Sequence, residues 1–351
     1  MASLTVVAYQ SRKIIKYGGF GIVGLVVVYS LVMGIIEAYL RANPPYVPPT
    51  VKYGRIDKVV FPEKKFGAKQ FTLELPEDKL PTIKDQARVY IIYQPTSNIL
   101  ALEYGVRTAK AMGFTSKPKE AGTGIYEFDN AITKQKLTLN TLDGSFRLTY
   151  PYQEDQLLMT VGQVPDKAGA IEASKLFLEA ADKWNEELET GEKKISFWKI
   201  DYDGLRAVAS QSEANVTRVD LYRLAIPYYQ GETDAKIVNS EVGRATISLM
   251  VSGSSVESKK MIEVDYKYHD IDRESFSTYP IISPEEAWAE LQKGNYWPAF
   301  DVSAEKVAIR RVYLAYYEPI VLTNYFQPVY VFEGDGNFVA YVPAVTLKYL
   351  K

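Results

Sequence analysis

Apolar residues form one unbroken run near the start of the chain, and elsewhere they alternate or recur at helical spacing. From Tyr17 to Ile36 the sequence reads YGGFGIVGLVVVYSLVMGII, without a single charged residue. A helix of this length spans about 30 Å, which is the thickness of the hydrocarbon core of a bilayer. No polar face marks a solvent side, so a buried core helix does not fit the run. The pattern predicts a transmembrane helix that contacts the lipid bilayer through residues 17–40.

The residues on either side of the span indicate how it is inserted. The segment IEAYLRANPP that follows offers no small-residue cleavage site, so we expect an uncleaved signal anchor. Arg12, Lys13 and Lys16 precede the span, whereas Arg41 alone follows it closely. The positive-inside rule then predicts a cytoplasmic tail over residues 1–16 and an extracytoplasmic location for everything after the span.

Two small residues within the span and the prolines after it have separate meanings. Ser30 and Gly34 form a small-xxx-small pair, a pattern that lets two transmembrane helices pack closely. The protein could therefore form an oligomer through this helix. The four prolines of ANPPYVPPT favour an extended backbone. We therefore expect a proline-rich linker over residues 41–57 between the membrane and the folded part.

Beyond the linker, helical and strand patterns follow each other in a repeated order. Residues 98–114 have apolar positions at helical spacing, and the strand-like segments GIYEFD, KLTLNT and SFRLTY come after them. Asp143-Gly144 joins the last two segments and is a strong hairpin signal. A second helical stretch begins at Lys167 and again precedes several strands. These patterns predict two extracytoplasmic α+β domains, over residues 58–165 and 166–351.

The clearest helix start in the chain lies at SPEEAWAEL. Ser283 is in the N-cap position, Pro284 occupies the first helical position, and Glu286 can complete a capping box. Trp288 and Leu291 belong to the apolar stripe that should face the strands after the helix. The predicted fold class is α+β, with one N-terminal transmembrane helix followed by modules of a helix and an antiparallel meander.

This last module resembles a known family. From about residue 279 onward, the helix entry YPIIS-x-x-EA, the short helix ending in Gly-Asn, and the strands VYLAYYEP and PVYVFE look like the PepSY-related domains of the YycH/YycI family. The residues that carry the resemblance are Ser283, Glu286, Ala287, Leu291, Tyr316, Tyr317, Pro328 and Val331. The resemblance covers the C-terminal third only. It implies a PepSY-like fold there and the role of a membrane-anchored extracytoplasmic regulator of a sensor kinase.

Composition and charge exclude several kinds of ligand, metal site and catalytic group. A net charge of −2 gives no basic face for nucleic acid, so no nucleic-acid partner is expected. The absence of cysteine excludes disulfides, thiolate metal sites and cysteine nucleophiles. His269 is the single histidine and lacks both a serine elbow and further metal ligands, so we interpret KYHDIDRES as a strand end with solvated charges. We expect no catalytic, cofactor-binding or metal residues and no cofactor.

Tyrosine is the unusual component, with 27 residues. Alternation places Tyr313 and Tyr317 on the face opposite Val312 and Leu314, and both faces are core only if the sheet is covered twice. Exposed aromatics suit a partner-binding surface, for which the candidates are Tyr313, Tyr317, Tyr325 and Trp297. Packing between modules is the competing interpretation and is favoured over exposure.

The sequence thus predicts a non-catalytic, single-pass envelope protein whose extracytoplasmic part binds a membrane or envelope protein. Regulation of a membrane sensor kinase is the specific form that the resemblance implies. Two alternatives stay open: a structural or scaffold subunit of an envelope, secretion or pilus assembly, and a cell-wall or glycan-binding module that uses tyrosines as stacking platforms.

Overall fold

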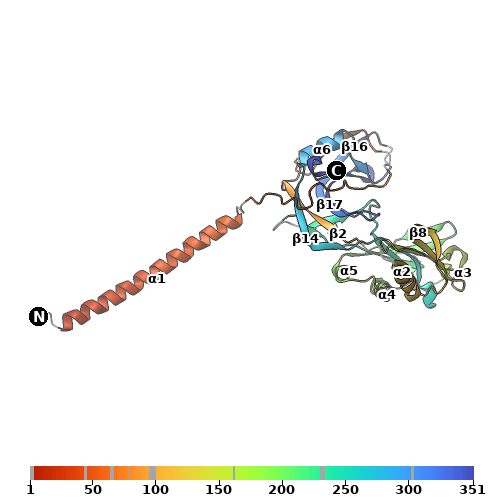
Figure 1. Ribbon diagram of the computed structural model, residues 1–351, viewed down its shortest axis with the longest axis horizontal. Helices are drawn as coiled ribbons and strands as arrows, with labels where there is room; N and C mark the ends of the chain where they lie inside the picture. Colours follow the sequence, from red (N-terminus) through yellow and green to blue (C-terminus); the bar gives the residue numbers. More distant parts are fainter. Residues whose placement is uncertain are drawn as a thin grey trace. The chain divides into compact units, whose positions relative to one another are not determined.

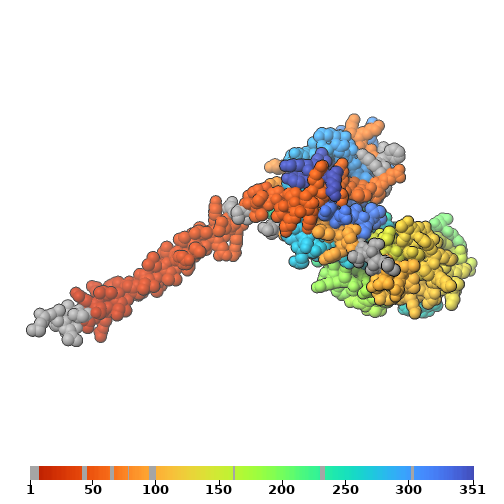
Figure 2. All heavy atoms as spheres, viewed as in Figure 1, coloured from red at the N-terminus to blue at the C-terminus, as the bar shows by residue number. Residues whose placement is uncertain are grey.

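The computed structural model describes residues 4–42, 46–63, 67–77, 79–94, 100–160, 163–229, 234–301 and 304–351. The chain forms two compact units, Met1–Pro48 and Pro49–Lys351 (Figures 1 and 2). We call the second of these the outer unit.

The first unit contains one long helix, α1 (Leu4–Ala42). Its residues 8–41 are long and apolar enough to cross a membrane, and the apolar side chains from Tyr17 to Ile36 are exposed. The helix begins well before the predicted span, so the tail predicted over residues 1–16 is itself helical from Leu4. Ser30 and Gly34 lie on exposed positions of α1, and their role in helix packing stays a prediction.

The outer unit contains two nine-stranded sheets. The first, here called the C-terminal sheet, has the order β10-β11-β16-β17-β18-β15, with β1 beside β16 and with β2 between β14 and β17. Its strands are β1 (Gln70–Leu73), β2 (Gln86–Ile92), β10 (Ile226–Pro227), β11 (Asp234–Val238), β14 (Ile271–Pro280), β15 (Trp297–Pro298), β16 (Lys306–Tyr317), β17 (Tyr325–Gly334) and β18 (Phe338–Pro343). All of its pairs are antiparallel except β1 with β16 and β11 with β16.

The second sheet, here called the central sheet, is antiparallel and has the order β3-β4-β5-β6-β13-β12-β9-β7-β8. Its strands are β3 (Lys119–Gly122), β4 (Ile125–Asp129), β5 (Lys136–Asn140), β6 (Phe146–Thr149), β7 (Lys193–Asp201), β8 (Gly204–Val208), β9 (Val216–Leu221), β12 (Ile247–Ser252) and β13 (Met261–Tyr266). The helices α2 (Ala101–Ala111) and α4 (Lys167–Ala180) pack on one face, through Ala109, Ala170 and Leu178. The short helix α3 (Gln156–Met159) contributes Leu158 to a separate cluster with Ile200 and Met250.

The capped helix that the sequence predicts is present as α6 (Pro284–Gln292). The Ser283 side chain accepts a hydrogen bond from the backbone N–H of Glu286, and the Glu286 carboxylate accepts one from the backbone N–H of Ser283, at 3.2 and 2.7 Å. Leu291 is buried against the C-terminal sheet. Trp288, expected in the core, is only half-buried, with its ring centroid 6.2 Å from that of Phe332. The fold class is confirmed: a long apolar N-terminal helix precedes an α+β unit with largely antiparallel sheets.

Sheet pairing differs from the predicted division into domains at residues 58–165 and 166–351. Strand β6 pairs with β13, while β2 pairs with β14 and β17, so each sheet draws strands from both sides of that boundary. The predicted linker over residues 41–57 is also too long. Thr50 donates its backbone N–H to the Thr278 hydroxyl, and Ile56 is fully buried and bridges to Leu350. Residues 49–57 therefore belong to the outer unit.

Candidate functional site

Two of the four aromatic residues proposed as a partner surface are buried. Tyr317 and Trp297 are 2% and 4% exposed. Phe61 stacks on Trp297 with 5.5 Å between ring centroids and meets Tyr317 edge-on at 4.7 Å. The indole N–H of Trp297 donates to the Pro62 carbonyl at 3.0 Å. The C-terminal sheet is thus covered twice, by α6 on one face and by the segment around Phe61 on the other, and these two residues serve packing.

The other two aromatic residues are half-buried and lie in different clusters. The Tyr313 hydroxyl donates to Glu333 at 2.7 Å, and its ring packs against the cluster that contains Trp297. Tyr325 instead stacks on Tyr53 with 5.6 Å between centroids. The four residues therefore do not form one exposed surface.

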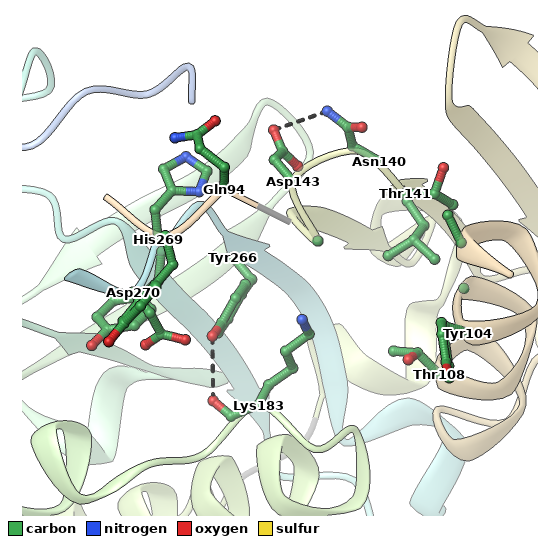
Figure 3. Close-up of a pocket in the computed structure, with 16 residues that line it drawn as sticks. Gln94, Tyr104, Thr108, Asn140, Thr141, Asp143, Lys183, Tyr266, His269 and Asp270 are labelled. Carbon is green, nitrogen blue, oxygen red and sulfur yellow. Dashed lines mark hydrogen bonds between the residues drawn. The ribbon is translucent and has the colours of Figure 1, made fainter. Parts of the chain in front are cut away.

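A pocket of about 420 Å³ in the outer unit is the better candidate site (Figure 3). It combines four tyrosines with amide, hydroxyl and charged side chains. The lining comes from the residues after β2, from α2, from the end of β5 and the turn after it, from the chain after α4, and from the end of β13 and the chain after it. It consists of Tyr93, Gln94, Ala101, Tyr104, Gly105, Thr108, Leu139, Asn140, Thr141, Asp143, Gly144, Lys183, Tyr266, Tyr268, His269 and Asp270. Its volume is within the range of about 300–1,000 Å³ that is common for ligand pockets.

The β5–β6 turn, which is the hairpin that Asp143-Gly144 predicted, forms one wall of the pocket. Gly144 has φ +74°, a conformation that glycine adopts easily. Asn140 donates its side-chain amide to Asp143 Oδ2 at 2.9 Å, while Ser145 donates its backbone N–H and its hydroxyl to Asp143 Oδ1 at 2.8 and 2.6 Å. The Asp143 carboxylate is therefore largely occupied by its own turn.

Lys183 follows α4 and directs its ammonium group toward the middle of the pocket in Figure 3. Its Nζ lies 5.5 Å from the centroid of the Tyr266 ring. Among the described residues, no carboxylate oxygen lies within 4.0 Å of this nitrogen. Burial lowers the pKa of Lys183, and the more distant carboxylates of Asp270, Asp182 and Asp143 oppose that effect. Lys183 is thus a partly desolvated cation without a direct counter-ion in the described structure.

His269, expected at a solvated strand end, is in fact buried, at 5% exposure. Its Nε2 has no hydrogen-bond partner among the described residues. Burial lowers the pKa of the imidazole, and the Arg223 cation adds to that effect against the carboxylates of Asp143 and Glu318. Because Nε2 is also inaccessible to solvent, it does not face the open space of the pocket.

A buried ion-pair cluster next to the pocket holds this segment in place. Arg223 is in contact with Glu318 at 3.0 Å and with Glu187 at 3.1 Å, and it also donates to the backbone carbonyl of His269. Its guanidinium lies 4.0 Å from the centroid of the Tyr268 ring. Burial alone would lower the pKa of Arg223, but Glu318, Tyr268 and Glu187 outweigh it and keep the pKa above its ordinary value.

The site residues predicted from the sequence did not include Lys183, Arg223 or Glu318. Only a weak sequence feature indicates the buried pair: Arg223 and Glu318 are single charges inside the apolar segments LYRLAIP and LAYYEP. A charged residue in such a segment is seldom fully buried unless it is paired.

No family model matches the sequence, and no curated protein matches it. Solved structures give remote likenesses. One is an uncharacterized protein from Eubacterium rectale ATCC 33656, 13% identical, with a TM-score of 0.38 over 83% of this chain and 91% of that one. Another is the Bacillus megaterium YpeB C-terminal domain, also 13% identical, with a TM-score of 0.28 over 72% of this chain and 95% of that one. The resemblance to the YycH/YycI family stays a prediction.

Proposed function

We propose that this chain is a non-catalytic, single-pass envelope protein whose outer unit binds a partner protein at the Lys183 pocket. The observation that carries the proposal is the composition of that pocket. Tyr93 and Tyr104 line it while 55% and 46% exposed, so large aromatic surfaces face a hollow that also offers amide and charged groups. Aromatic side chains of this kind are enriched where proteins bind each other.

Membrane anchoring rests on α1, whose exposed apolar side chains would lie in lipid rather than in water. The cytoplasmic position of the N-terminus rests on Arg12, Lys13 and Lys16, which outnumber Arg41 on the other side of the span. With that orientation the pocket faces the extracytoplasmic space, so the partner is another envelope protein or the outer part of a membrane protein.

The finer proposal is that the partner is a membrane sensor kinase. Its support is the resemblance of residues from about 279 onward to the YycH/YycI family, together with the single apolar helix at the start of the chain. The pocket itself does not distinguish a kinase from another envelope protein.

Site-specific photocrosslinking in intact membranes tests the proposal. A photoreactive phenylalanine analogue replaces Tyr104 in one full-length variant and Tyr202 in a control, because Tyr202 is 87% exposed and lies outside the pocket. We expect a discrete adduct from position 104 and none from position 202, and mass spectrometry of the adduct identifies the partner. Equal adducts from both positions, or none from position 104, would contradict docking at the pocket.

A further inference from the structure

The pocket presents one cation that the described structure does not neutralise directly. Lys183 is half-buried, its ammonium group points into the hollow, and no described carboxylate oxygen approaches it within 4.0 Å. A desolvated ammonium gains from a charge-assisted hydrogen bond, and an anionic ligand group supplies one. The nearby Tyr266 ring, 5.5 Å from Nζ, offsets only part of the lost hydration.

The rest of the lining argues against a ligand with many negative charges. Asp143 and Asp270 also line the pocket and would repel a second anionic group. Asp143 is occupied by its own turn, whereas Asp270 accepts only a long hydrogen bond, 3.4 Å from the Asn185 amide, among the contacts of the described residues. The pocket thus offers one site for an anion beside the Asp270 carboxylate, which can accept from an N–H group.

We propose that this pocket binds the carboxylate end of a peptide chain, with Lys183 pairing with the carboxylate. The acceptor Asp270 suits a backbone N–H group next to it, and the exposed ring of Tyr104 suits its last side chain. The inference rests on the proposed function, since the peptide end would belong to the docked partner. Stem peptides of the cell wall also end in a carboxylate, so the test separates the two sources.

The experiment titrates three probes into the full-length protein in detergent and follows them by saturation-transfer NMR. The probes are acetyl-Ala-Ala-Phe with a free carboxylate, the same peptide as its C-terminal amide, and diacetyl-Lys-D-Ala-D-Ala as the wall-type peptide. We expect the free acid to bind about tenfold or more tightly than the amide, the effect of one charge-assisted hydrogen bond. This comparison uses the unaltered protein and so does not depend on any variant folding.

Two variants then locate the effect. Lys183→Met keeps an unbranched side chain one atom shorter and removes the charge, and it should abolish the preference for the acid. Lys194→Met is the matched control, because Lys194 is exposed on β7 and outside the pocket, and it should keep the preference. Equal binding of acid and amide, or an unchanged preference in Lys183→Met, would overturn the inference.

The probes also separate this inference from the proposed function. Tighter binding of the D-Ala-D-Ala probe would keep the carboxylate site and overturn a partner protein as its source. If crosslinking from position 104 persists in Lys183→Met while no probe binds, docking at the pocket stands and the carboxylate inference fails.

Discussion

Replacing Glu318 by Gln should destabilise the outer unit strongly, because it leaves the buried Arg223 without its closest counter-ion. The side chains of Arg223 and Glu318 are 1% and 5% exposed, and the Arg223 guanidinium makes two hydrogen bonds, of 3.0 and 3.1 Å, to one Glu318 oxygen. The other oxygen accepts from the Thr246 hydroxyl at 3.0 Å. Breaking a buried ion pair by removing one partner costs about 3–5 kcal/mol. Glu187 still contacts Arg223 at 3.1 Å, so we expect the lower end of that range.

Urea unfolding of the full-length protein in detergent, followed by tryptophan fluorescence, measures the effect. With a slope of about 3 kcal/mol per molar urea, a loss of about 3 kcal/mol lowers the midpoint by about 1 M. Glu257→Gln is the matched control: the same chemical change removes a partner of Lys260, but Glu257 is 84% exposed. Exposed pairs contribute about 0–1 kcal/mol, so the control midpoint should move little. Equal shifts in the two variants would refute the account of a desolvated cluster.

Three further predictions follow from the helix, the histidine and the anchor. Ser283→Ala should lower the free energy of unfolding by about 0.5–2 kcal/mol, because the helix cap is lost. Trp288→Ala should lower it by about 1–3 kcal/mol, which is less than the about 3–5 kcal/mol expected for a fully buried tryptophan. Urea midpoints measure both changes, and a larger loss for Ser283→Ala than for Trp288→Ala would contradict this order. Burial lowers the pKa of His269, so below about pH 6.5 the unfolded chain binds a proton that the folded chain resists, and stability should fall as the pH drops. His269→Gln should flatten that dependence between pH 7.5 and 5.5, and an unchanged profile would assign it to other groups. The protein should resist carbonate extraction and keep its N-terminus near Met1, whereas a mature N-terminus between Ala38 and Pro49 would exclude an uncleaved anchor.

The sequence by itself determined the features that depend on neighbours a few residues away. The capping box at Ser283 and Glu286 and the hairpin turn at Asp143-Gly144 follow from contacts between residues two to four positions apart. The membrane-length helix follows from an unbroken apolar run. Because each of these features depends only on residues that are near one another in the sequence, residue type and spacing are enough to predict it.

Only the tertiary structure decided which strands share a sheet and which side chains meet. The pairing of β6 with β13 joins residues more than 100 positions apart, and alternation says which residues share a face of a strand but not what covers that face. Tyr317 and Trp297 are buried because Phe61, more than 200 residues earlier, packs over them. Lys183 and His269 likewise line one pocket although no local pattern links them. Their burial, and with it the lowered pKa of each, arises from chain folded around them and is not encoded in their immediate sequence.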